Sequence, residues 1–428
     1  MEFGMFSGLL LALLAIAFLL QVDFIFYILY VCLGVYLWSR WYFPRTLHGL
    51  ERRRVFVQRA FWGEKVSVRL VVRHNGRFSL PWLQIHESVP VQLTAGEEVN
   101  EVFLLRGRET AEFVYHLQAR RRGYYKIGPL WLKTGDLFGL IPEKTETLPP
   151  DYLTIYPRII PLGYLGLPSR QLFGTISSQQ RLFADPTRPM GVRDYRSGDP
   201  IRQIHWKASG HTRKLVVKTY EPAISLETAV VLNLCTTEYT RYSRAQITEW
   251  AIEVAASLAA HLVNQRQPVG LLTNGIDPLV GTAVSSQPVF DSQSGRLLTD
   301  ATPENAATHM PPHIPPRSGR AHLMKILEQL ARIEAAETIP LSQWLIPACM
   351  HLNWGIALLI VTPKGDEATC QTIHRLVRTG LNPILLVVEP DANFGRVRER
   401  AAQLGFVAYH VAVRQDLDRW KRPLQVRV

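Results

Sequence analysis

Cysteine is scarce in this 428-residue sequence, and the four cysteines that it has lie far apart. They are Cys32, Cys235, Cys349 and Cys370. No two of them have the spacing of a metal-binding pair, and they do not form the even ladder of a small secreted scaffold. This distribution argues against a disulfide framework and favours a reducing compartment for the bulk of the chain.

The sequence also lacks the short motifs by which common enzyme classes are identified. It contains no Gly-x-x-x-x-Gly-Lys-Ser/Thr phosphate loop, no His-Glu-x-x-His pair and no Gly-x-Ser-x-Gly elbow. The thirteen histidines are scattered, and a lone histidine such as His205 is more often structural than catalytic. Cys235 follows an apolar strand near basic residues, but no base stands beside it. We therefore expect no enzymatic activity, no catalytic residue and no cofactor.

Negative charge is in the minority. The chain has 36 Asp and Glu against 48 Lys and Arg, which gives a net charge of +12 at pH 7. Such a balance suits nucleic acid, anionic lipid or an acidic protein partner, and the sum alone does not choose among them.

Charged residues are nearly absent from residues 3–42. A bilayer core needs about 20 apolar residues for each helical span, and two spans fit on either side of the break Leu20-Gln21-Val22-Asp23. A cleaved signal peptide is the alternative, but residues 1–4 carry no basic group and the apolar run is too long. We predict a two-helix transmembrane hairpin over residues 1–42.

Basic residues follow the second predicted span, namely Arg40, Arg45, Arg52, Arg53 and Arg54. By the positive-inside rule they place the rest of the chain in the cytoplasm. The prediction is thus a multi-pass protein of the plasma membrane with most of its chain cytoplasmic. An interfacial aromatic belt is expected from Trp38, Trp41, Tyr42 and Phe43.

Residues 43–158 contain short alternating runs, such as VSVRLVVRH and LPWLQIHES, separated by turn signals such as Asn75-Gly76. Strands at this spacing, without helices between them, predict an antiparallel β-sandwich. Three consecutive arginines, Arg120 to Arg122, precede one of these strands. Such a run is more often a solvated strand edge than a binding site.

Residues 223–428 alternate continuous apolar strands with helices, which predicts an α/β domain whose parallel sheet is covered on both faces. The expected strands are 228–234, 268–273, 355–362, 383–388 and 406–411. The expected helices are 247–264, one from residue 321, 367–379 and 395–404. Residues 275–318, rich in Pro, Ser, Thr and Gly, are predicted to be a flexible insertion, and 159–222 a linker.

Residues 191–222 are the most distinctive part of that linker. Ser197-Gly198-Asp199-Pro200 predicts a turn that opens a short helix, which Gly210 would end before a strand over 214–221. Residues 181–222 hold nine Lys and Arg against four Asp and Glu, a local net charge of +5. These charges could form an ion-pair network beneath a packed tryptophan that only fixes the linker, or they could form a docking surface.

The same stretch resembles, in order, the signature of the family known as domain of unknown function 58, Arg-x-Tyr-x-x-Gly-Asp-x-x-Arg-x-Ile-x-Trp-x-x-Ser-Ala-Arg. The matching residues are Arg193, Tyr195, Gly198, Asp199, Arg202, Ile204, Trp206 and Ser209. Gly210 and His211 replace the last two. The segments Arg121-Arg122-Gly123-Tyr124-Tyr125 and Asp136-Leu137-Phe138-Gly139-Leu140 also resemble this family, with Leu137 in place of a proline.

The resemblance implies a von Willebrand factor type A-like fold for the C-terminal domain. That fold often binds Mg²⁺ through Asp-x-Ser-x-Ser and a later Thr-Asp-Gly. Here Asn233 replaces the carboxylate and Cys235 the first hydroxyl, while Thr237 and Thr362 remain and Pro363-Lys364 replaces Asp-Gly. Mg²⁺ prefers hard oxygen ligands that include carboxylates. We expect a degenerate site that binds no metal, and a Mg-dependent adhesion-type module remains an alternative.

The resemblance also implies a link to AAA+ ATPases of the MoxR type. We therefore expect a membrane-anchored cytoplasmic adaptor or assembly factor in complex assembly or envelope processes, with the signature residues and Lys207 forming a partner surface and a junction between the two folded domains. No nucleic-acid partner is expected. Because basic residues interleave with Tyr195, Trp206 and Tyr220, binding to single-stranded nucleic acid or another anionic surface remains an alternative.

Overall fold

The computed structural model describes residues 3–20, 23–47, 49–94, 99–138, 143–162, 184–196, 204–222, 227–280, 290–291, 295–297, 309–414 and 416. The chain divides into two compact units. The first unit comprises residues 1–158, 277–301 and 327–334, and the second comprises 159–276, 302–326 and 335–428.

The first unit begins with two helices, α1 (Phe3–Leu20) and α2 (Asp23–Leu47), on either side of the break that the sequence predicts. Among the described residues, one helix is long and apolar enough to cross a membrane, over Asp23–Thr46 of α2. A membrane anchor and a signal segment both have this character. Of the two predicted spans, the structure therefore confirms one N-terminal apolar helix.

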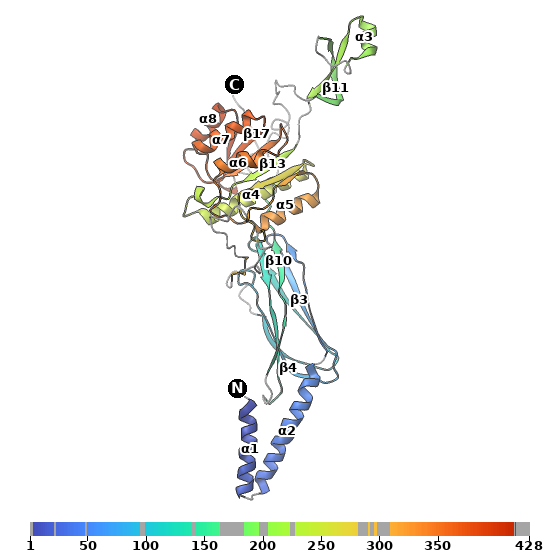
Figure 1. Ribbon diagram of the computed structural model, residues 1–428, viewed down its shortest axis with the longest axis vertical. Helices are drawn as coiled ribbons and strands as arrows, with labels where there is room; N and C mark the ends of the chain where they lie inside the picture. Colours follow the sequence, from blue (N-terminus) through green and yellow to red (C-terminus); the bar gives the residue numbers. More distant parts are fainter. Residues whose placement is uncertain are drawn as a thin grey trace. The chain divides into compact units, whose positions relative to one another are not determined.

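Among the described residues of the first unit, ten strands follow and form three sheets; Figure 1 shows these strands extending from the end of α2. The strands are β1 (Leu50–Val55), β2 (Arg59–Ala60), β3 (Lys65–His74), β4 (Leu80–Glu87), β5 (Val99–Leu105), β6 (Thr110–Gln118), β7 (Gly123–Ile127), β8 (Leu130–Thr134), β9 (Lys144–Leu148) and β10 (Asp151–Ile155). Their orders are β1-β3-β6, β2-β10-β7 and β5-β4-β8-β9. All pairs are antiparallel except the short pair β2 and β10. The predicted antiparallel sheets are confirmed.

Strand β3 supplies side chains to both apolar cores of this unit. Its burial alternates along its length, as expected for a strand with one face turned inward. Val68 lies in a cluster with Tyr125 and Leu153 of the β2-β10-β7 sheet. Leu70 lies in a second cluster with Leu83 of the four-stranded sheet. The period-two pattern of the sequence is thus the direct cause of this packing.

Arg54, one of the basic residues that follow the second predicted span, is buried. Its Nε donates to Oε1 of Glu87 at 2.6 Å and its Nη1 to Oδ2 of Asp151 at 2.7 Å. Tyr115 donates its hydroxyl to the other oxygen of Glu87 at 2.5 Å. Burial outweighs these partners and raises the pKa of Glu87. Arg54 therefore pairs with one buried carboxyl group, that of Glu87, and one partly exposed one, that of Asp151.

Arg122 is also buried, so the prediction of a solvated strand edge is wrong at this residue. Its Nη1 donates to the carbonyl oxygens of Leu330 at 3.0 Å, Ala331 at 3.2 Å and Ile333 at 2.8 Å. These carbonyls lie at the end of α5 (Arg320–Arg332), where helical carbonyls have no partner within the helix. Arg120 and Arg121 are exposed, as expected.

The second unit contains a six-stranded sheet of order β15-β14-β13-β16-β17-β18. The strands are β13 (Thr228–Leu232), β14 (Val269–Thr273), β15 (Ile314–Arg317), β16 (Ala357–Thr362), β17 (Asn382–Val387) and β18 (Val407–His410). All pairs are parallel except the edge pair β14 and β15. The predicted parallel sheet is confirmed as a mixed, mostly parallel one.

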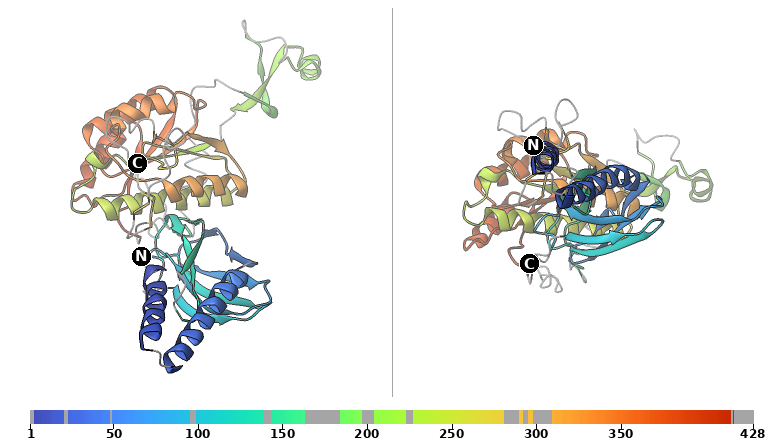
Figure 2. Two further views of the ribbon diagram at one scale, coloured as in Figure 1. Left: turned by 60° about the horizontal axis from the view of Figure 1, so that its bottom comes forward. Right: turned by 90° about the horizontal axis from the view of Figure 1, so that it is seen from below.

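Helices cover both faces of this sheet, as Figure 2 shows. They include α4 (Arg244–Asn264), α6 (Leu341–Cys349), α7 (Glu367–Arg378) and α8 (Phe394–Gln403). Val231 and Leu358 lie in one core cluster with Trp344 of α6, Ile373 of α7 and Val397 of α8. The helix α4, which buries residues along its whole length, lies on the opposite face. Helix α6 is absent from the sequence prediction because Pro347 lies inside it.

The predicted insertion 275–318 includes ordered pieces among its described residues. Strand β15 pairs with β14 through Arg317 and Ile314. Phe290 stacks on Tyr152 of the first unit, with ring centroids 5.7 Å apart. These contacts separate the segment into parts that belong to different units.

Candidate functional site

The parallel sheet of the second unit has a topological switch point between β13 and β16. From β13 the chain passes to β14 on one side and later to β16 on the other. In open α/β sheets, ligands bind in the crevice at the carboxyl ends of the strands at such a point. Asn233 directly follows β13, and Thr362 is the last residue of β16. Two predicted site residues therefore stand at the position that the topology favours.

Every hydrogen-bonding group of the Asn233 side chain is used by the protein itself. Its Nδ2 donates to Oε2 of Glu238 and, at 3.1 Å, to Oγ1 of Thr362. Its Oδ1 accepts from the backbone N–H of Cys235 at 3.1 Å and from Nδ2 of Asn274 at 2.9 Å. An amide has two donors and one oxygen with two lone pairs, so the side chain is saturated. The carbonyl of Asn233 also accepts the hydroxyl of Tyr239 at 2.6 Å.

Cys235 and Thr237 join the same cluster. The sulfur of Cys235 lies 3.1 Å from Oγ1 of Thr237, and it donates to the carbonyl oxygen of Thr338 at 3.1 Å. Cys235 is fully buried, and a buried thiol of this kind is inert. This geometry does not suit a nucleophile. All four predicted residues, Asn233, Cys235, Thr237 and Thr362, are thus brought together.

Three residues of the cluster are missing from the sequence prediction, namely Glu238, Asn274 and Glu389. Asn274 follows β14 and donates also to the carbonyl of Ile339 at 3.0 Å. Glu238 accepts from the N–H of Leu341 at 3.0 Å, and Glu389 from that of Thr240 at 3.0 Å. A residue just past a buried strand was the available signal for Asn274. Glu389 directly follows the predicted strand 383–388 and carried the same signal, whereas Glu238 gave none.

These residues do not fit a bound Mg²⁺. Both lone pairs of the Asn233 amide oxygen accept hydrogen bonds from protein donors. The ammonium group of Lys364 lies 3.5 Å from the carboxylate of Glu389 and would repel a cation there. Burial is the main cause that raises the pKa of Glu238, which favours its neutral form over the carboxylate that a hard cation prefers. Within the described part of the chain, no three His, Cys, Asp or Glu side chains form a group that could hold a metal.

The family signature forms a hairpin in the second unit. Strand β11 (Ala184–Asp194) pairs antiparallel with β12 (Val216–Pro222), and α3 (Trp206–Thr212) lies between them in the chain. The helix begins later than predicted, because Nδ1 of His205 accepts the N–H of Ala208 at 3.1 Å and caps it there. It also continues past Gly210, and Arg213 ends it with a left-handed backbone.

Ile204 and Ser209 fix this hairpin from within. Ile204 is buried and forms an isolated bridge with Val217. Oγ of Ser209 accepts the N–H of Val216 at 3.0 Å, which ties α3 to the start of β12. Arg193 and Tyr195 are half-buried near the end of β11, and the N–H of Tyr195 donates to Leu215. Ile204 and Ser209 thus hold the two strands and α3 of the hairpin together.

Trp206 lies outward with 66% of its surface exposed, and Lys207 is exposed beside it. The interpretation of Trp206 as a packed tryptophan is therefore wrong. The orientation of α3 is set by its cap and by the buried residues Ile204 and Ser209. In this orientation Trp206 faces solvent. Gly198, Asp199 and Arg202, together with the predicted turn at 197–200, lie outside the described residues.

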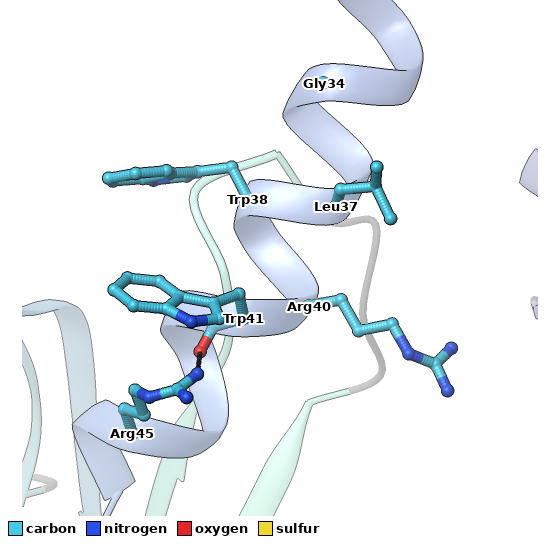
Figure 3. A pocket seen from close by; sticks show the side chains of 6 residues that line it. All are labelled: Gly34, Leu37, Trp38, Arg40, Trp41 and Arg45. Atoms are coloured by element: carbon cyan, nitrogen blue, oxygen red, sulfur yellow. Dashed lines mark hydrogen bonds between the residues drawn. The ribbon is translucent and has the colours of Figure 1, made fainter.

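The end of α2 carries part of the predicted aromatic belt. Trp38 and Trp41 are exposed, with ring centroids 5.6 Å apart, and the guanidinium of Arg45 lies over Trp41 at 4.3 Å. Figure 3 shows them lining a hollow with Arg40 on another side of the helix. Phe43 is buried and does not belong to the belt.

Comparison with known proteins identifies one part of the chain. Residues 191–283 match the family described as "Protein of unknown function DUF58", as the signature predicts. The chain is 23% identical over 218 residues to "Uncharacterized protein YeaD" of Bacillus subtilis (strain 168), covering 50% of this chain and 52% of that protein. The chain thus spans about half the length of this curated relative.

Solved structures resemble small parts of the chain. A chain of the human zinc 2-glycoprotein and prolactin inducible protein complex covers 25% of this chain and 94% of its own, with 11% identity and a TM-score of 0.20. The sporulation control protein Spo0M of Bacillus subtilis covers 29% and 56%, with 14% identity and a TM-score of 0.17.

Proposed function

We propose that this protein is a membrane-anchored adaptor or assembly factor that binds protein partners and has no enzymatic activity of its own. Helix α2 supports the anchor, because it is apolar over Asp23–Thr46 and ends in Trp38, Trp41, Arg40 and Arg45. With α1 as a second span, both termini and the folded units are cytoplasmic. The partner docks on the hairpin β11–α3–β12.

The exposure of Trp206 is the observation that carries this proposal. A tryptophan held outward by a fixed helix is the side chain type that most often dominates a binding interface. Exposed cations surround it in the sequence, namely Lys207, Arg213 and Lys214. Such charges favour an acidic partner, and they chiefly raise its association rate and orient its docking.

The closed network around Asn233 supports partner binding without a metal. The strand order and the position of this network agree with the proposed von Willebrand factor type A-like fold. In that fold an open Mg²⁺ site would take a ligand oxygen, but here protein donors and acceptors occupy the equivalent groups. A Mg-dependent adhesion-type function is therefore the weaker proposal.

The family resemblance nominates a MoxR-type AAA+ ATPase as the acidic partner, in complex assembly or envelope processes. The test is binding of the full chain in mild detergent to this ATPase, with and without ATP. Trp206→Ala and Lys207→Glu should each weaken binding at least tenfold. Tyr242→Ala and Arg398→Glu are matched controls, because both residues are exposed in the same unit away from α3.

Ionic strength and competing ligands sharpen this test. Binding should weaken between low and physiological salt, because exposed charges are screened beyond about 8–10 Å. Tight retention on single-stranded DNA at physiological salt, with no binding to the ATPase, would replace this proposal by the nucleic-acid alternative. Equal loss in the control variants would show that the hairpin is not the docking site.

A further inference from the structure

One end of the strands in the first unit lies against α2, and it carries an exposed apolar turn that the proposed function does not use. We infer that Leu137 and Phe138 of this turn enter the lipid–water interface, and that neighbouring arginines bind the phosphates of anionic phospholipids. The sheets of the first unit would then contact the bilayer directly, in addition to their covalent link to α2. This inference rests on the proposal that α2 is a membrane anchor.

The turn after β8 presents two adjacent large apolar side chains to solvent. Leu137 is 72% exposed and Phe138 is 60% exposed. Hydrogen bonds hold the turn's described residues in place: the N–H of Phe138 donates to Oδ2 of Asp136 at 3.3 Å, and Nε1 of Trp82 donates to the carbonyl of Asp136 at 3.3 Å. Exposed apolar residues held together in this way commonly mark a contact with a protein or a membrane.

A buried hydrogen bond sets the position of this turn along α2. Oγ of Ser39 donates to Oδ2 of Asp136 at 2.7 Å. Ser39 lies between Trp38 and Arg40, which are exposed and of the types that collect at the lipid–water interface. Figure 3 shows this part of the helix with Trp38 and Trp41 on one side and Arg40 on another. Leu137 and Phe138 therefore stand next to the interfacial turn of the anchor.

Two more turns of the first unit reach the same place. Phe78 packs edge-on against Trp41 and Tyr42, with ring centroids 5.7 and 5.5 Å apart. The hydroxyl of Tyr42 donates to the carbonyl of Ser79 at 2.7 Å. The N–H of Arg108 donates to the carbonyl of Gly76 at 3.1 Å, which joins the turn at 106–109 to the turn at 75–79.

These turns gather positive charge around the apolar pair. The exposed arginines of this end are Arg40, Arg45, Arg77, Arg106 and Arg108. The described acidic groups here all have partners: Asp136 is bound to Ser39, Glu109 accepts the N–H of Arg106 within its own turn, Glu51 accepts from Asn75, and Glu143 pairs with Lys133. Clustered arginines beside a membrane helix are attracted to anionic lipid. Apolar tips surrounded by cations fit an anionic bilayer better than a protein surface of one fixed shape.

The test places an environment-sensitive fluorophore on a single cysteine of the full chain in liposomes. The background carries Cys32→Ala, because the other three cysteines are buried. The probe positions are Phe138→Cys, Leu37→Cys in α2 as the anchor reference, and Val91→Cys. Val91 is an exposed apolar residue, and it follows β4 at the end of that strand away from α2.

Liposomes of phosphatidylcholine with phosphatidylglycerol and a headgroup-level quencher should quench the probe at 138 and leave the probe at 91 unaffected. Quenching at 138 should fall in pure phosphatidylcholine and in Arg77→Glu/Arg106→Glu. A probe at 138 that reports water, while the probe at 37 reports lipid, would overturn this inference and leave the anchor intact. If both probes report water, the anchor itself is wrong.

Discussion

Asn233 donates a 3.1 Å hydrogen bond from Nδ2 to Oγ1 of Thr362, and this bond joins the ends of the two strands between which the sheet order reverses. A side chain with two free oxygens at this point would be a cation ligand. An amide whose oxygen is already shared between Cys235 and Asn274 is a cross-link. The consequence is a site that stabilises the domain by its own contacts.

Millimolar Mg²⁺ should not raise the melting temperature of the full chain in detergent. A ligand that binds only the folded state stabilises it by about 2.7 kcal/mol at one hundred times its dissociation constant. Because the side-chain oxygen of Asn233 already accepts two hydrogen bonds, it cannot bind Mg²⁺, and no comparable stabilisation is expected. Thermal melts with Mg²⁺ and with EDTA measure this, and a saturable rise that EDTA reverses would contradict it.

Asn233→Asp should lower stability by about 1–3 kcal/mol, because the donors to Glu238 and Thr362 are lost and a second carboxyl group faces Glu238. Mg²⁺ should then raise the melting temperature of this variant. Asn382→Asp is the control, since Asn382 begins β17, at the opposite end of the strands from Asn233. A variant as stable as the wild type would show that the network does not depend on the amide.

Stability should fall as pH rises through the ionisation of Glu238. Burial raises the pKa of this carboxyl in the folded protein, so folding favours the protonated form. That contribution is complete below the unfolded pKa and is lost as pH passes the raised folded value. Glu238→Gln should flatten this part of the stability profile, whereas Glu399→Gln, at an exposed residue, should leave it unchanged.

Trp206→Ala should change the free energy of unfolding by less than about 0.5 kcal/mol, as is usual for exposed positions. Trp344→Ala, in the core between α6 and the sheet, should cost about 3–5 kcal/mol. Denaturant melts of both variants give the comparison. Equal losses would mean that Trp206 is packed in solution.

Arg122→Ala should destabilise the protein by more than about 2 kcal/mol, because each buried polar group left without a partner costs about 1–3 kcal/mol. Three carbonyls at the end of α5 depend on this guanidinium. Arg121→Ala is the neighbouring control, because Arg121 is exposed. The same denaturant melts apply, and similar small effects in both variants would show that water replaces Arg122.

The sequence by itself determined the main strands and helices of both units, but not α6, which contains Pro347, or β15, which lies in the predicted insertion. Alternation with period two buried one face of β3, and continuous apolar strands separated by helices placed β13, β14, β16, β17 and β18 in a parallel sheet. It also determined the family of residues 191–283 and the association of Asn233 with Thr362. These results depend on local periodicity and on the rule that parallel strands end at one edge, and both are visible in a chain without coordinates.

Tertiary structure decided which charged and aromatic side chains are buried. Arg54 and Arg122 are buried because each donates to an acceptor far away in the sequence, Glu87 and Ile333 respectively. Trp206, in contrast, is exposed. The partners of Asn233 include Asn274, which is 41 residues away. Burial of a polar side chain depends on acceptors that long-range packing supplies, so no local pattern could reveal it.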